Sequence, residues 1–79
     1  MNREQIYERL NEVFRDVFDD DTIIVNDKTT ADDIEDWDSL EHINLMVEIE
    51  HAFHIKFNMG EINKMKNVGE LADIIQKRI

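Results

Sequence analysis

Asp36-Trp37-Asp38-Ser39-Leu40 marks the point where an acidic, turn-rich segment ends and the most apolar run of the chain begins. Asp38, followed three residues later by Glu41, predicts a capping box: the Asp38 carboxylate accepts a hydrogen bond from a backbone N–H of the first turn, and Glu41 reaches back. A helix is therefore expected to begin at Ser39, the only serine in the chain. A hydroxyl at this position is exposed at the positive end of the helix dipole, beside unpaired N–H groups that favour a phosphate. The stretch thus predicts Ser39 as a site for a phosphoester.

The length and composition of the chain limit its class. Its 79 residues predict a single domain, residues 1–79, whose small core buries about 60–65% of the surface that the unfolded chain exposes. The sequence shows neither a signal peptide nor a run of roughly 18 apolar residues, so we expect a cytoplasmic protein that does not span a membrane. The chain has no cysteine. It therefore offers no disulfide and no thiolate, and a sulfur nucleophile would have to come from a cofactor.

Charge narrows the classes of partner. The chain carries 19 acidic and 9 basic residues, for a formal net charge of -10. Because no basic stripe is present to neutralise phosphates, nucleic acid is not an expected partner. Basic proteins are the expected partners, and self-repulsion in so small a fold predicts that stability rises with salt.

The spacing of apolar residues predicts an all-α fold. Apolar positions three and four residues apart favour helices over residues 3–18, 39–54 and 68–78, and a short third helix is expected over residues 61–65. Residues 19–37 show no sustained period and are interpreted as a long ordered loop, which is pinned to the core by some of Ile23, Ile24, Val25 and Ile34. The predicted architecture is a small helical bundle of three main helices plus the short third helix.

The second predicted helix has more apolar residues than one core face requires. A first set, the core stripe, consists of Leu45, Met46, Ile49 and Phe53. A second set, the outer stripe, consists of Leu40, Ile43 and Val47, and it is edged by Glu41, Asn44, Glu48 and Glu50. Since a domain of this size can hardly bury both, one stripe is interpreted as a docking surface whose acidic rim steers a partner. The alternative is that neighbouring helices cover both stripes.

Together these features resemble the acyl carrier protein family. An exposed serine, preceded by Asp38 and followed by Leu40, opens the second helix of a small, acidic, cysteine-free bundle. The short third helix and the start of the last helix at Val68 fit the same family, as do Glu41 and the spacing of Leu45, Ile49 and Phe53 after the serine. The resemblance covers nearly the whole chain.

The resemblance implies that Ser39 is the attachment site of 4′-phosphopantetheine, which a separate, magnesium-dependent phosphopantetheinyl transferase takes from coenzyme A. The thiol of this arm would carry acyl groups as thioesters between loading, condensing and acyltransferase enzymes, whose basic patches meet the acidic rim. The chain itself would be a monomer that neither catalyses a reaction nor binds a metal. The family's recognition helix corresponds to Asp38, Leu40, Glu41, Ile43, Val47, Glu48 and Glu50. A core lined by Leu45, Ile49, Phe53, Ile62, Leu71 and Ile75 would loosen to shelter an acyl chain.

Three residues depart from the pattern of housekeeping fatty-acid carriers. Asn44 and His51 stand where those carriers present acids, and Trp37 replaces a small residue before the Asp-Ser-Leu motif. The Trp-Asp-Ser-Leu form is more similar to carriers dedicated to polyketides, specialised lipids or the acylation of surface polysaccharides. A simpler interpretation of Trp37 is a hydrophobic plug over the start of the helix.

Competing interpretations exist for single residues. His42 lies three residues after Ser39 and could act as its base in a hydrolase, but no third orienting group and no glycine-rich oxyanion turn accompany them. His42 is better interpreted as a partly buried, hydrogen-bonded side chain. His51 and His54, with Glu50 beside them, could hold zinc on one helix face, but they lack a fourth ligand and are better interpreted as solvated side chains.

A different class of function also fits the composition. An acidic helical adaptor that is never modified could dock through the outer stripe alone. The discriminating residue is Ser39, because a carrier loses all function in Ser39→Ala, whereas an adaptor tolerates this change.

Overall fold

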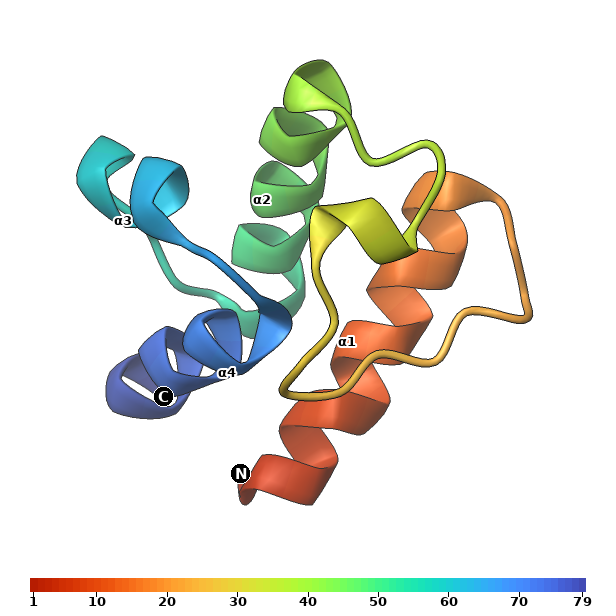
Figure 1. The fold of residues 1–79 in the computed structure, drawn as a ribbon. Coiled ribbons are helices and arrows are strands. Elements are labelled where there is room, and N and C mark those ends of the chain that lie inside the picture. Colours follow the sequence, from red (N-terminus) through yellow and green to blue (C-terminus); the bar gives the residue numbers. More distant parts are fainter.

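The computed structural model describes residues 1–79 as an all-helical bundle without strands. Its elements, in order, are α1 (Arg3–Phe18), the 3₁₀ turn η1 (Ala31–Asp33), α2 (Ser39–Phe53), α3 (Met59–Lys64) and α4 (Val68–Arg78). Figure 1 shows α1 and α2 side by side, α4 across one end of the pair, and α3 at the outer edge on the side away from α1. The predicted fold class and the three main helices are confirmed.

The three main helices meet in one core because each has a continuous apolar face. The buried side chains of α1 recur at spacings of three and four residues, as the sequence predicts, and so do those of α2 and α4. The fully buried side chains with the largest volume are Phe14, Ile6, Leu10, Leu45, Met46, Ile49, Leu71, Ile75 and Val68. No helix is both long and apolar enough to cross a membrane.

Local capping sets the ends of α1. Asn2 and Gln5 form a reciprocal capping box, in which the Gln5 N–H donates to Asn2 Oδ1 and the Asn2 N–H donates to Gln5 Oε1. The helix ends at Asp19, which adopts the left-handed conformation with φ 50°. The N–H groups of Asp19 and Asp20 both donate to the carbonyl of Arg15, which closes the last turn of the helix.

The long loop between α1 and α2 is ordered, as predicted, but it contains a helical turn that the sequence analysis missed. Thr30 and Asp33 form a capping box around η1. Val25 is buried and Ile23 and Ile34 pack against the core, whereas Ile24 points to solvent. Three of the four apolar residues proposed as pins therefore fulfil that role.

The loop also completes the start of α4. The Val68 N–H donates to the Thr29 carbonyl at 2.8 Å, and the Gly69 N–H donates to the Asp27 carbonyl at 3.1 Å. These two donors lie in the first turn of α4, where no intrahelical acceptor exists. A segment far away in the sequence thus supplies the acceptors that the helix end needs.

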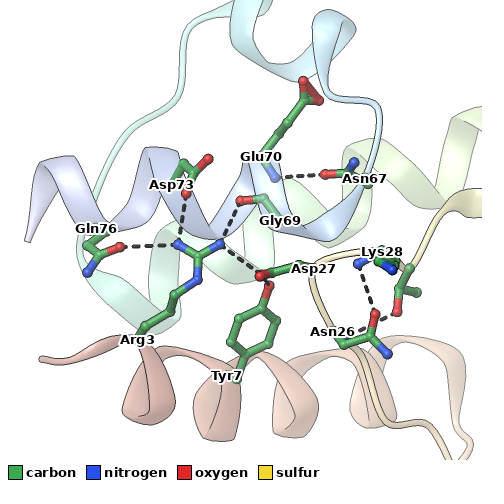
Figure 2. Close-up of polar contacts among 11 residues, drawn as sticks. Arg3, Tyr7, Asn26, Asp27, Lys28, Asn67, Gly69, Glu70, Asp73 and Gln76 are labelled. Atoms are coloured by element: carbon green, nitrogen blue, oxygen red, sulfur yellow. Dashed lines mark hydrogen bonds and ion pairs between the residues drawn. The ribbon is translucent and has the colours of Figure 1, made fainter.

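A polar cluster at Arg3 connects α1, the loop and α4 (Figure 2). The Arg3 guanidinium pairs with Asp27 and Asp73, each at 2.8 Å, and it also donates to the carbonyl of Gly69 and to Gln76. Tyr7 donates its hydroxyl proton to the same Asp27 carboxylate.

The Tyr7 hydroxyl and the Arg3 guanidinium together lower the pKa of Asp27 below its ordinary value. Burial and the negative charge of Asp27 raise the pKa of Tyr7.

The short helix α3 begins two residues earlier than predicted. Its N-cap is Asn58, which forms a capping box with Glu61, a pattern visible in the sequence but not used in the prediction. No side chain of α3 is fully buried. An ion pair holds α3 to α4, because both guanidinium nitrogens of Arg78 donate to the Glu61 carboxylate, at 2.7 and 2.5 Å. The pair with Arg78 lowers the pKa of Glu61.

Candidate functional site at the start of α2

Ser39 is the first residue of α2, and it is exposed. The Asp38 carboxylate caps the helix by accepting the Glu41 N–H at 2.8 Å. The second half of the predicted capping box is wrong, because Glu41 does not reach back to the Asp38 N–H. That N–H donates to the carbonyl of Asp36, and Glu41 accepts from the side chain of Asn44 at 3.3 Å.

The backbone around Ser39 leaves donors free for an anion. The N–H groups of Ser39 and Leu40 have no acceptor in the chain, whereas the next two N–H groups both bond to Asp38. Two free N–H groups at the positive end of a 15-residue helix thus lie next to the Ser39 hydroxyl. Such a position stabilises a phosphate through hydrogen bonds and the helix dipole. The residues present therefore fit a phosphoester-linked group at Ser39.

Trp37 closes the core behind this site. Its indole is buried, 5.3 Å from the Phe14 ring centroid in an edge-to-face arrangement, and it also contacts Phe18. The interpretation of Trp37 as a hydrophobic plug is confirmed. The indole N–H donates to Nδ1 of His42 at 3.0 Å, and Nε2 of the same ring lies 3.0 Å from the Ile62 carbonyl. His42 is thus the partly buried, hydrogen-bonded side chain that the sequence analysis favoured.

A cavity of about 540 Å³ opens beside Ser39. One wall comes from the start of α2 and from Trp37, and the opposite wall comes from the end of α3 and the residues that follow it. Its lining residues are Ala31, Trp37, Asp38, Ser39, His42, Ile43, Ile62, Asn63, Met65, Lys66 and Asn67. The contribution of Asn63, Lys66 and Asn67 was not predicted from the sequence, because no local pattern indicates that this segment faces Ser39.

The two apolar stripes of α2 have different environments. The core stripe, Leu45, Met46, Ile49 and Phe53, is buried throughout. The outer stripe is exposed, with relative accessibilities of 70% for Leu40, 43% for Ile43 and 41% for Val47. No neighbouring helix covers it, so the alternative in which both stripes are buried is wrong.

The acidic residues expected along the outer stripe divide into two groups. Asp38, Glu41 and Glu48 lie on or near the surface at this face, and Asn44 and His51 are exposed with them. Glu50 differs, because its carboxylate accepts the Phe57 N–H at 2.8 Å and stabilises the connection to α3. The structure therefore gives Glu50 an internal contact, while Asp38, Glu41 and Glu48 stay at the surface within reach of a partner.

The histidines show no arrangement for metal or hydrolytic chemistry. His51 and His54 are both exposed, and no group of three His, Cys, Asp or Glu side chains is placed to hold a metal ion. His54 ends α2 in the left-handed conformation, with φ 56°. The ring nitrogens of His42 bond to Trp37 and Ile62, and neither is shown bonded to Ser39. The arrangement thus lacks the serine–histidine contact of a nucleophilic site.

Comparisons with known proteins agree with this geometry. A family model described as "Phosphopantetheine attachment site" matches residues 8–75. Among solved structures, the chain is similar to the solution NMR structure of a holo acyl carrier protein from Geobacter metallireducens, with 50% sequence identity and a TM-score of 0.85 over 91% of this chain and 83% of that chain. A search of curated proteins found no match.

The family match spans residues 8–75, and the structural match covers 91% of the chain. They support the predicted cofactor, phosphopantetheine, and the acyl-carrier fold inferred from the residues. The chain therefore belongs to the phosphopantetheine attachment site family, as a carrier of the acyl carrier protein kind.

Proposed function

We propose that Ser39 is the residue of this chain that bears 4′-phosphopantetheine. The supporting observation is its position: an exposed hydroxyl at the start of α2, next to two free backbone N–H groups and a cavity. In the transfer, Ser39 Oγ forms a bond to the phosphorus of the phosphopantetheine phosphate in coenzyme A. The bond to the second phosphate breaks, adenosine 3′,5′-bisphosphate leaves, and the hydroxyl proton is lost to the transferase or to water. The arm supplies the thiol that holds acyl groups as thioesters.

The outer stripe of α2 is the proposed docking surface for the transferase and for the enzymes that load and use the cargo. It begins one residue after Ser39 and is exposed along its length, so a bound enzyme would have the arm at its edge. The surrounding acids, Asp38, Glu41 and Glu48, would attract a basic patch and raise the association rate. Because the apolar area is modest, such contacts suit rapid exchange between successive enzymes.

We further propose that the carrier serves a dedicated pathway for a polyketide, a specialised lipid or a polysaccharide substituent rather than bulk fatty-acid synthesis. Asn44 and His51 support this proposal, because they are exposed with the outer stripe at positions where housekeeping carriers present acids. Trp37 gives no support to the proposed pathway, because its packing in the core is a sufficient reason for a tryptophan at this position.

The experiment is an intact-mass measurement after incubation with coenzyme A, magnesium and a broad-specificity phosphopantetheinyl transferase. The wild-type chain should gain one phosphopantetheine, and Ser39→Ala should gain none. A melting curve for Ser39→Ala close to that of the wild type shows that the loss is chemical, since an exposed hydroxyl contributes little to stability. A folded wild-type chain that gains no mass with two different transferases would contradict the proposal and favour an unmodified adaptor.

A further inference from the structure

The short helix α3 is attached to the bundle mainly by polar contacts. None of its side chains is fully buried, although Ile62 and the following Met65 pack partly against the core. Arg78 holds its outer side through Glu61, and His42 holds its inner side through the Ile62 carbonyl. An element with so little buried apolar surface opens at low free-energy cost when such contacts are removed. The hydrogen bond between His42 and Ile62 is therefore one of the few contacts that hold α3 beside Ser39.

The Ile62 carbonyl is available to His42 because the helix ends early. In a continuing helix this carbonyl would accept the N–H of Lys66, four residues later. The Lys66 N–H instead donates to the Glu70 carboxylate at 2.7 Å, and α3 ends at Lys64. The freed carbonyl then accepts from His42 across the gap between α2 and α3, a contact between residues 20 apart in sequence. The bond is thus a tertiary connection and not part of a helix ladder.

The hydrogen bonds of His42 define its state. An indole N–H can only donate, so Nδ1 of His42 must accept from Trp37 and carries no proton. In the neutral ring Nε2 then carries the proton and donates to the Ile62 carbonyl, which can only accept. Trp37 is fixed in turn by its packing against Phe14. The chain of contacts from Trp37 through His42 to Ile62 therefore connects α3 to the rigid core.

We propose that His42 is a specificity-determining positioning residue that keeps α3 closed against α2 and so separates the cavity beside Ser39 from the apolar core. The proposal rests on the proposed carrier function. Ile62 and Met65 line this cavity and also pack against the core, so they form the wall between the two. With the wall closed, cargo on the arm meets a cavity lined in part by Asp38, Asn63, Lys66 and Asn67, which suits short or polar acyl groups. A long apolar chain reaches the core only after the bond from His42 to Ile62 is broken.

Two amide variants separate this role from general destabilisation. In His42→Gln the side-chain amide nitrogen reaches about as far as Nε2 and still donates to the Ile62 carbonyl. In His42→Asn the shorter side chain keeps an acceptor near the Trp37 indole but cannot reach Ile62. Both variants replace the ring by the same chemical group, so a difference between them reports the bond to α3.

The first measurement is amide hydrogen exchange in the unmodified protein. Residues 59–65 of His42→Asn should exchange at least about tenfold faster than those of the wild type, while His42→Gln remains within about threefold of it. Amides of the core stripe serve as the internal reference. Equal exchange of residues 59–65 in all three proteins would overturn the proposal, whether or not Ser39 accepts an arm.

The second measurement compares acetyl and octanoyl forms made from the corresponding coenzyme A thioesters by a broad-specificity transferase and verified by intact mass. Within each protein the melting temperature of the acetyl form is subtracted from that of the octanoyl form, which cancels the effect of the substitution itself. We expect a difference of under about 2 °C for the wild type and His42→Gln, and about 4–8 °C for His42→Asn, in which the longer chain gains apolar contacts. An equally large rise in the wild type would overturn the proposal. A failure to gain mass would count against Ser39 as the attachment site, and hydrogen exchange would still decide the role of His42.

Discussion

Gly69, in the first turn of α4, shows how closely the long loop approaches the helix. A Cβ atom added at this position would lie 2.7 Å from the Asp27 carbonyl oxygen, a distance that real Cβ atoms do not adopt. The carbonyl cannot move away freely, because it accepts the Gly69 N–H. The absence of a side chain at Gly69 is therefore required by contact and not by an unusual backbone angle.

Gly69→Ala should destabilise the protein by about 1–3 kcal/mol, the usual cost of forcing extra volume into a packed site. Thermal or denaturant unfolding measures this loss. Gly60→Ala is the matched control, because its Cβ would meet only the Asn58 side chain, at an ordinary 3.4 Å. This control should be neutral or gain about 0.4–1 kcal/mol through the reduced entropy of the unfolded chain. Equal effects of the two substitutions would contradict the close approach at Gly69.

For single residues, the features of the site that depend on residues nearby in the sequence could be predicted. The cap by Asp38, the exposure of Ser39 and the plug formed by Trp37 all follow from signals within a few positions. The partner of Glu41 could not be predicted, because Asn44 competes for its carboxylate and only the structure decides between them. The bond from His42 to Ile62 could not be predicted either, since a backbone carbonyl carries no sequence signal.

Among the elements, α2 is divided lengthwise into a structural face and a free face. Ile49 on the core stripe is completely buried, whereas Val47 on the outer stripe is exposed. The sequence predicted this division from an excess of apolar positions. The apolar pattern alone could not identify which stripe faces the core, because that depends on where α1 and α4 pack. The family resemblance assigned Leu45, Ile49 and Phe53 to the core and the outer stripe to docking.

Val47→Ala and Ile49→Ala form a pair that tests the two faces. Ile49→Ala removes buried methyl groups and should lower the free energy of unfolding by about 2–5 kcal/mol. Val47→Ala should change this free energy by less than about 0.5 kcal/mol, since the position is on the surface. Instead, Val47→Ala should slow the transfer of phosphopantetheine at limiting transferase concentration. A Val47→Ala protein that is modified at the wild-type rate would argue against docking through the outer stripe.

The boundaries of the elements show where periodicity is informative. Helices α1, α2 and α4 lie within one residue of their predicted ends, because each presents a long amphipathic face. The turn η1 has three residues, too few for a period to appear. The start of α3 lies two residues before its predicted position, because Asn58 and Glu61 form a capping box there and the short helix has no long apolar face to mark its beginning.

The connection among α1, the loop and α4 should depend on pH through Asp27. Hydrogen bonds from Tyr7 and Arg3 lower the pKa of this carboxyl in the folded protein, relative to about 3.9 in an unfolded chain. A depressed folded-state pKa means that the ionised form stabilises the fold at pH values above the unfolded pKa. This contribution is lost as the pH falls through the lower, folded-state pKa.

Asp27→Asn tests this dependence. The wild type should melt at a higher temperature than Asp27→Asn at pH 7, and the difference should shrink as the pH falls below about 4. Comparing the two proteins at each pH removes the contributions of other carboxyls, such as Glu61, whose pKa is also lowered. A difference that stays constant from pH 7 to pH 2.5 would show that the charge of Asp27 is not involved.

Over the whole molecule, negative charge is concentrated where the long loop meets the end of α1. An open hollow of about 770 Å³ in this region is lined by five carboxylate residues: Asp19, Asp20, Asp33, Glu35 and Asp36. With a formal net charge of -10 on 79 residues, repulsion opposes the compact state. Folding holds these carboxylates near one another. Salt ions that screen their repulsion should therefore stabilise the folded protein.

The melting temperature should therefore rise with KCl between 20 mM and 500 mM, as the Debye length falls to a few ångströms. Asp21 and Glu35 are exposed acids without a hydrogen bond or ion pair, which makes them suitable for a matched variant. The double substitution Asp21→Asn and Glu35→Gln should raise the melting temperature at low salt and reduce its increase with salt. A melting temperature that falls with salt in the wild type would show that ion pairs such as those of Arg3 outweigh the repulsion.

The bonds from the start of α4 to the carbonyls of Asp27 and Thr29 also constrain the order in which the molecule assembles. They join segments about forty residues apart, and closing so long a stretch costs chain entropy before any contact forms. The facing ends of α1 and α2, Phe18 and Ser39, are separated by a shorter stretch of chain, and their pairing does not require α4. The first turn of α4 should therefore be completed late in folding, and substitutions there should accelerate unfolding more than they slow refolding.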